Sequence, residues 1–294
     1  YKDFSALDVS STIYIDDGAF DVISSIPSFY MKDSLFIKDF SFLVNGPRDE
    51  LSLKLFADGA ENSSLQLFAN LITKDEGVTL NFNPSNIYLN DQFWMIDKDN
   101  EILIGDRISS KNLKLYNGMS ELLVDLEIGA KEKQADIFLS NIFIEDFTQF
   151  LALRDIDLNG IANGRVSVDL SDDSPGFYGD LMVENIKVND YQIGNLNTSA
   201  ILDLPNKKVK LNGNLYGEDN EVDINGTYSF AKEITENDFD LNFDIKNFAI
   251  YSIEDFIPLY IDNTDGTVSG SLSLVGPRNK PDLLGYLDIN DVTT

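Results

Sequence analysis

Apolar and polar residues alternate one by one along much of this chain. In one stretch, polar residues separate four apolar positions, Phe239, Leu241, Phe243 and Ile245. This period of two places the apolar side chains on one face of an extended segment and the polar ones on the other. The same period recurs at residues 51–55, 78–82, 122–128 and 222–230. The alternation predicts half-buried β-strands.

Turn residues divide the alternating segments. Examples are Asn45-Gly46-Pro47, Gly217-Glu218-Asp219-Asn220 and Gly276-Pro277. Strands between such turns recur roughly every ten to fifteen residues, which predicts an all-β fold of mostly antiparallel neighbours. Short helices are expected near residues 144–152 and 253–260, where apolar residues fall three and four apart.

A pattern in the second half of the chain returns after 106 residues without a gap. Gly160, Gly164, Pro175 and Gly179 reappear as Gly266, Gly270, Pro281 and Gly285. Around these positions, interpreted as turn glycines and prolines, the apolar residues of the two copies also coincide. The spacing predicts a repeated supersecondary unit in which each copy covers its neighbour. With no low-complexity linker, residues 1–294 are interpreted as one continuous repeat region.

The composition excludes several classes of function. Fifty acidic residues against 22 basic ones give a formal charge of −28, which disfavours binding to nucleic acid or to anionic lipid headgroups. The absence of cysteine and histidine excludes Cys-His and Ser-His-Asp nucleophiles and thiolate or histidine metal sites. No pair of acids stands out for glycoside hydrolysis. We therefore expect neither an enzyme nor a cofactor.

Two local features have simple structural explanations. Asp155, Asp157, Asn159 and Gly160 match the first half of an EF-hand loop, but Val166 stands where that loop needs a bidentate Glu. We therefore expect no metal site there. The single tryptophan, Trp94, is interpreted as a core anchor, with carbohydrate stacking as its alternative function.

An apolar sheet face needs a cover, and three closures are compatible with the pattern. Two sheets could pack as a sandwich, the strands could form a membrane barrel, or one sheet could curl into a trough with an apolar interior. The pattern predicts strands shorter than the nine to eleven residues of a membrane barrel, and one tryptophan cannot form aromatic girdles. The residue pattern alone favours the sandwich, as in an adhesin or a carbohydrate-binding array.

The stretch 253–290 resembles the repeating unit of the TamB family, the translocation and assembly module subunits related to AsmA-like proteins. The resemblance rests on the order of Gly266, Gly270, Leu272, Leu274, Gly276, Pro281, Gly285, Leu287 and Ile289. The earlier copy has Leu170 in place of Gly276. Phe93-Trp94-Met95-Ile96 also resembles a recurrent sequence motif of TamB-like chains of the Bacteroidota type.

The resemblance implies a fragment of a periplasmic protein that is anchored in the inner membrane of a Gram-negative bacterium. It implies a β-taco groove that carries phospholipid between the membranes, a role in outer-membrane protein assembly and secretion, and an outer-membrane barrel partner, TamA or a relative. With it, the trough becomes the favoured closure. The predicted lipid-groove residues are Val166, Val168, Leu181, Val183, Phe239, Leu241, Phe243, Ile245, Leu272, Leu274, Leu287 and Ile289.

Overall fold

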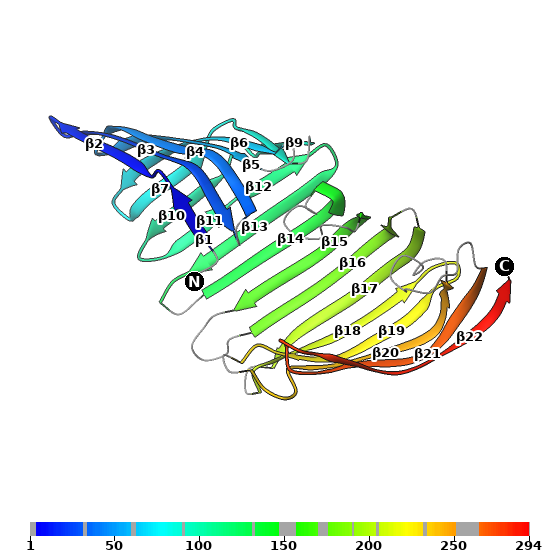
Figure 1. Cartoon of the computed structure of the whole chain (residues 1–294). Helices are drawn as coiled ribbons and strands as arrows, with labels where there is room; N and C mark the ends of the chain where they lie inside the picture. Colours follow the sequence, from blue (N-terminus) through cyan, green and yellow to red (C-terminus); the bar gives the residue numbers. More distant parts are fainter. Residues whose placement is uncertain are drawn as a thin grey trace. The chain divides into compact units, whose positions relative to one another are not determined.

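The computed structural model shows an antiparallel all-β protein (Figure 1). It describes residues 4–31, 34–59, 63–89, 92–130, 133–146, 157–169, 176–189, 191–203, 206–231, 234–250 and 265–293. These residues form 22 strands, and every assigned pairing is antiparallel, which confirms the predicted fold class.

The chain divides into two compact units. Unit 1 comprises residues 1–140 with 146–152, and unit 2 comprises residues 141–145 with 153–294. Within the described part of the chain, no helix is long and apolar enough to cross a membrane.

Unit 1 is a sheet in which several long strands are interrupted. Its strands are β1 (Phe4–Leu7), β2 (Ser10–Asp16), β3 (Ala19–Met31), β4 (Ser34–Pro47), β5 (Glu50–Gly59), β6 (Ser64–Lys74), β7 (Gly77–Phe82), β8 (Asn86–Leu89), β9 (Gln92–Ile96), β10 (Glu101–Gly105), β11 (Ile108–Lys111), β12 (Leu113–Asn117), β13 (Ser120–Ile128) and most of β14 (Lys133–Phe143). Strands β1 and β2 pair with successive parts of β3, and β3, β4, β5 and β6 then follow in order.

Beyond β6, the next three positions in the sheet of unit 1 are each filled by two short strands. Both β7 and β8 pair with β6. At the next position, β10 pairs with β7 and β9 pairs with β8. At the third position, β11 pairs with β10 and β12 pairs with β9, and both also pair with β13. The interruptions fall at residues 83–85, at residues 97–100 and at Asn112, on three adjacent positions of the sheet. We call this line of interruptions the break row.

Unit 2 is a meander of eight long strands that curves in Figure 1. The strands are β15 (Leu158–Asp169), β16 (Gly176–Val188), β17 (Tyr191–Asp203), β18 (Lys208–Tyr216), β19 (Glu221–Ser229), β20 (Phe239–Ala249), β21 (Asp265–Gly276) and β22 (Asp282–Thr293). Each pairs with the next in sequence. These strands span 9 to 13 residues, so the expectation of strands shorter than nine to eleven residues is wrong.

Bulges and glycines bend the strands of unit 2. Register shifts occur between Asn159 and Ile161, between Val183 and Ile186, and between Ile245 and Phe248. Gly270 has φ of 149°, and a Cβ there would strike the backbone carbonyl of Tyr286 on β22. A side chain is incompatible with so close an approach of two strands, so glycine permits the local bend.

The predicted helices are not formed where the structure describes them. Residues 144–146 form a short 3₁₀ turn, and the remainder of 144–152 lies outside the described residues, as does all of 253–260. A Cβ placed on Gly160 would meet Ile144 Cδ1 at 3.4 Å, so this turn packs against the start of β15.

The fully buried apolar residues of unit 2 gather at one end of its strands. They include Ala162, Val183, Val222, Ala249 and Val268, each no more than 7% exposed. In unit 1, Trp94 is 0% exposed and pairs in register with Ile87, which confirms its interpretation as a core anchor.

Candidate functional site

Register places all twelve predicted groove residues on one face of the sheet in unit 2. Residues directly opposite each other in an antiparallel ladder point to the same side. Val166 and Val168 lie opposite Gly179 and Phe177, while Leu181 and Val183 lie opposite Gly164 and Ala162. The predicted residues of β20, β21 and β22 continue the face.

The strands between these two groups extend the same face. Leu196 and Ala200 lie opposite Leu215 and Leu211, which in turn lie opposite Val222 and Gly226. Val222, Ile224, Gly226 and Tyr228 then lie opposite Ile245, Phe243, Leu241 and Phe239. We call this side of the sheet, which runs from β15 to β22, the apolar face.

Much of the apolar face is only half buried. Leu211, Ile224, Leu241, Phe243 and Leu272 lie on interior strands, yet each keeps intermediate exposure. In a sandwich, a second sheet would cover side chains at the centre of such a face. On the last strand, Leu287 is 40% exposed and Ile289 55%. This face therefore offers accessible apolar area of the kind that marks a ligand or partner surface.

The repeat glycines do not lie in turns, which corrects the interpretation from their spacing. Gly160 and Gly164 lie in β15, Gly179 in β16, Gly266 and Gly270 in β21, and Gly285 in β22. Several of them lie where neighbouring backbones approach closely, and this requirement can recur in a repeat as regularly as a turn. Pro281 does precede a strand, β22, whereas Pro175 lies outside the described residues.

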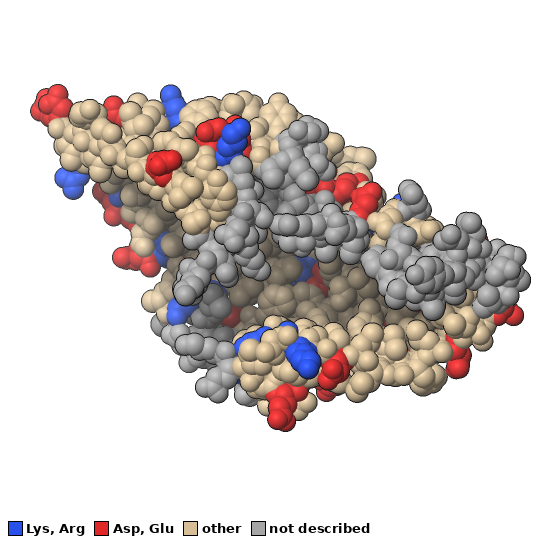
Figure 2. All heavy atoms as spheres, viewed as in Figure 1, with Lys and Arg blue, Asp and Glu red and all other residues tan. Residues whose placement is uncertain are grey.

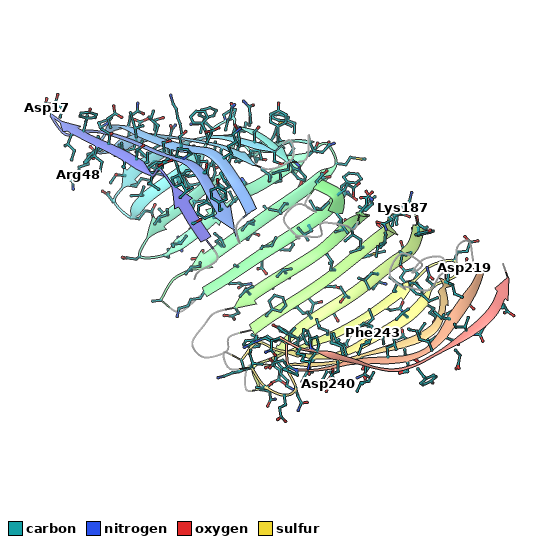
Figure 3. All side chains as sticks on the ribbon, viewed as in Figure 1. Asp17, Arg48, Lys187, Asp219, Asp240 and Phe243 are labelled. Atoms are coloured by element: carbon teal, nitrogen blue, oxygen red, sulfur yellow. The ribbon has the colours of Figure 1, made fainter. Side chains whose placement is uncertain are left out.

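The opposite face of unit 2 carries mostly polar side chains, and in Figure 3 the labelled Phe243 and Asp240 come from the two sides of β20. Lys246 Nζ lies 2.6 Å from Glu221 Oε1 and 2.9 Å from Asp223 Oδ2. The hydrogen bond from Lys246, followed by that from Asn214, lowers the pKa of Asp223. These side chains are about half exposed, so their ion pairs contribute little to stability. Acidic groups lie scattered over the face shown in Figure 2.

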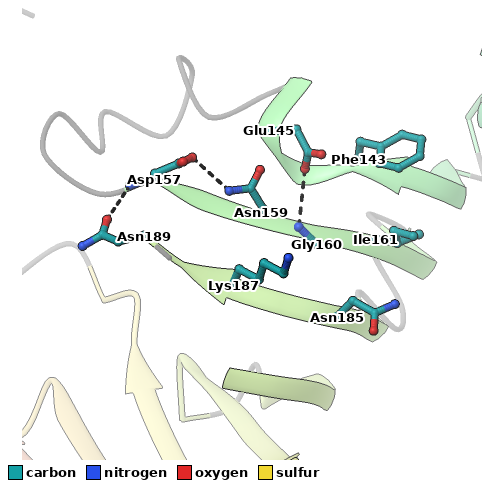
Figure 4. Close-up of a pocket in the computed structure, with 9 residues that line it drawn as sticks. All are labelled: Phe143, Glu145, Asp157, Asn159, Gly160, Ile161, Asn185, Lys187 and Asn189. Carbon is teal, nitrogen blue, oxygen red and sulfur yellow. Dashed lines mark hydrogen bonds between the residues drawn. The ribbon is translucent and has the colours of Figure 1, made fainter. Parts of the chain in front are cut away.

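The EF-hand-like residues line a polar pocket in unit 2 (Figure 4). The Asp157 N–H donates to Asn189 Oδ1 at 3.1 Å, and Asn159 Nδ2 donates to Asp157 Oδ1 at 3.0 Å. The Gly160 N–H donates to Glu145 Oε2 at 3.4 Å. These groups order the start of β15, while Asp155 lies outside the described residues. The described residues contain no group of three or more acidic side chains placed to hold a metal ion.

Sequence reasoning missed a second exposed surface, in unit 1. Tyr88, Phe93 and Met95 are 37–41% exposed and lie on the side of the sheet opposite to Trp94. The alternation of Phe93, Trp94 and Met95 carries this signal, because residues on either side of a buried strand residue point to the other face. The pairing that brings Tyr88 beside Phe93 depends on the register of the β8–β9 hairpin.

One comparison with known proteins gives a match. Residues 209–294, from the second residue of β18 to the end of the chain, match the family model of the TamB C-terminal domain. Neither the curated proteins nor the solved structures compared with the chain gave a significant match. The family match covers β18 to β22, five of the eight strands that carry the apolar face.

Proposed function

We propose that this TamB-family chain is a passive carrier that shields phospholipid acyl chains on the apolar face of unit 2. Proteins of this family belong to the cell envelope and act in translocation and assembly or in lipid transport. The proposal that the chain shields acyl chains rests on the continuous, half-buried apolar face. It crosses eight strands that pair in sequence order, and the side chains behind it are mostly polar.

The physical basis of the proposal is the burial of apolar area. Each methylene group removed from water contributes about 0.8 kcal/mol, so a chain lying over Phe243 and its neighbours would be held by many small increments. No enclosed pocket is required, and a chain can shift along the face while headgroups stay in water. A non-enzymatic carrier of this kind needs no nucleophile and no cofactor.

The proposal places the chain in the periplasm, as part of a protein anchored in the inner membrane of a Gram-negative bacterium. A TamA-type outer-membrane barrel is the partner that the family implies. Lipid would pass between the two membranes along the apolar face.

The test compares two double variants of the chain expressed in a bacterial periplasm. Phe243 and Leu272 lie directly opposite each other, so Phe243→Asp with Leu272→Asp puts two charges on the apolar face. The neighbouring pair on the other face provides the control, Asn242→Asp with Ser273→Asp. Native mass spectrometry and lipid extraction should detect phospholipid on the wild type and on the control, and little on the first variant. A folded wild type without lipid, or equal lipid on both variants, would contradict the proposal.

A second function is favoured by β22, which pairs only with β21 among the described strands and whose polar-face residues Leu284 and Tyr286 are 57% and 62% exposed. An exposed strand edge can add to another sheet by β-augmentation. We therefore also propose that this edge pairs with a strand of an outer-membrane barrel during assembly. Cysteine cross-linking from Leu284→Cys to single-cysteine variants of the barrel's edge strands tests this; contacts confined to the barrel surface would contradict it.

A further inference from the structure

An aromatic surface lies on the outer side of unit 1, opposite the face that buries Trp94. The rings of Tyr88 and Phe93 lie side by side, with centroids 5.1 Å apart and planes inclined at 43°. Met95 pairs in register with Tyr116 on β12, which brings a third ring next to Phe93 and Met95. Tyr88, Phe93 and Met95 remain 41%, 37% and 37% exposed. Tyr88 and Phe93 therefore form an exposed pair of rings, here called the platform, and beside them Lys114 Nζ lies 5.7 Å from the centroid of the Tyr116 ring.

A pocket of about 420 Å³ adjoins the platform at the break row. Phe93, Met95 and Tyr116 form its apolar side. Its polar residues include Asn86, Asp97 and Lys98. Asp97 forms an ion pair with Lys114, in which Oδ2 and Nζ lie 3.7 Å apart. The pocket therefore combines ring faces with donors and acceptors, the composition expected of a small-ligand site.

Buried polar side chains hold both rims of this pocket in place. Asn100 is 1% exposed; its Oδ1 accepts from the Phe82 N–H at 2.7 Å, and its Nδ2 donates to the carbonyls of Phe82 and Asp97. Ser85, 6% exposed, accepts from the Phe68 N–H at 3.0 Å and donates to the Asn83 carbonyl at 2.8 Å. Surface loops fixed by buried amide and hydroxyl groups are preorganised for binding, since little order is lost when a ligand arrives.

We propose that the platform and pocket together bind an uncharged oligosaccharide. The C–H faces of pyranose rings stack on exposed aromatic rings, while hydroxyl and acetamido groups pair with amide and carboxylate groups at the rim. The rings form an open surface instead of the cage that selects quaternary ammonium ions. The formal charge of −28 disfavours anionic polymers.

The site is independent of the proposed lipid-carrying function, because it uses other residues in the other unit. It provides a reason for exposed rings on the outer side of unit 1, which the apolar face of unit 2 does not explain.

The test measures binding of a β-1,4-linked N-acetylglucosamine tetrasaccharide to the whole chain by calorimetry and by line broadening of the sugar's NMR signals. We expect saturable binding at millimolar sugar or below, weakened about tenfold by Phe93→Ala and by Tyr116→Ala. Phe93→Tyr should keep the wild-type affinity within about threefold, because it retains the stacking ring. Tyr286→Ala, which removes an exposed ring from unit 2, is the matched control and should bind like the wild type.

Several results would overturn the proposal. These are the absence of binding by a folded wild type, equal binding by Phe93→Ala, and equal loss in Tyr286→Ala. Binding of zwitterionic phospholipid vesicles that depends on Phe93 while the sugar does not bind would overturn it in favour of a membrane contact. Near-ultraviolet circular dichroism on each variant separates loss of the site from loss of folding.

Discussion

At the scale of single residues, the carboxylate of Asp238 is the best-defined buried charge in unit 2. It is 0% exposed and accepts hydrogen bonds from Thr235 Oγ1 at 2.6 Å and from the Thr235 N–H at 3.0 Å. It also accepts a hydrogen bond from the backbone N–H of Arg278 at 3.3 Å. Arg278 also donates to the Ala231 carbonyl at 2.8 Å. Asp238 therefore ties the loop before β20 to the turn after β21.

The pKa of Asp238 predicts a specific dependence on pH. The hydrogen bond from the Thr235 side chain, with smaller help from Arg278, lowers the pKa of this carboxyl below its ordinary value. The ionised group therefore stabilises the fold fully above the unfolded-state pKa of about 4, and this contribution is lost as pH falls through the lower folded-state pKa. We expect Asp238→Asn to lower the melting temperature by a few degrees near neutral pH, with the gap closing in acid.

The control for this prediction is Asp240→Asn, because Asp240 lies two residues further along the chain, exposed on β20. Thermal unfolding of the three proteins followed by circular dichroism across the acid range measures the difference. If the difference in melting temperature between Asp238→Asn and the wild type stays constant with pH, the charge of Asp238 does not contribute to stability.

Replacing a repeat glycine by alanine should have a large effect on stability at one position and a small effect at another. Gly270→Ala forces an L residue to φ of 149° and drives a Cβ against the Tyr286 carbonyl, so we expect a loss of about 2–4 kcal/mol in unfolding free energy. A Cβ at Gly179 would meet the Phe177 ring at an ordinary 3.5 Å, so Gly179→Ala should change the unfolding free energy by no more than about 1 kcal/mol. Urea unfolding measures both. Equal effects would mean that the two positions share one conformational requirement.

At the scale of elements, β22 pairs only with β21 among the described strands. Its described side chains are exposed on both faces, including Leu283 at 62% and Tyr286 at 62%. Exposed edges of this kind promote association between copies, and lysine on an edge strand opposes it. We expect Leu284→Lys with Tyr286→Lys to lower the sedimentation coefficient at high protein concentration. Tyr178→Lys, at a 43% exposed position on the interior strand β16, should leave association unchanged, and an equal effect there would point to charge alone.

Strands could be predicted from sequence wherever one face is apolar. The alternation from Phe239 to Ile245 fixes which side chains share a face, and the ladders carry that face across unit 2. Strand length could not be predicted, because glycines such as Gly164 and Gly179 resemble turns in sequence but lie inside strands. The bulges and the break row depend on pairing between strands and were not predictable from local pattern, and the Tyr88–Phe93 platform depends in addition on the register of the β8–β9 hairpin.

At the scale of the whole molecule, net charge and ion pairs have opposite effects on the stability of the fold. The chain carries 28 uncompensated negative charges, whose mutual repulsion destabilises the folded state. Among the described residues, the ion pairs are mostly exposed or half exposed, as for Lys74 with Glu101 and Arg107 with Glu127, and each contributes little. Salt screens both effects, so their balance decides the sign of the response.

Because repulsion involves many charges and the ion pairs of the described residues are individually weak, we expect added salt to stabilise the protein. The melting temperature should rise as sodium chloride increases from about 0.01 M to 0.15 M, over which range the screening length shortens from about 30 Å to 8 Å. Replacing Asp240 and Asp244 by Asn, on the polar face of β20, should raise the low-salt melting temperature and flatten the rise. Potassium chloride at equal ionic strength is the control for ion-specific effects. A melting temperature that falls with salt would mean that pairs such as that of Lys246 with Glu221 outweigh the repulsion.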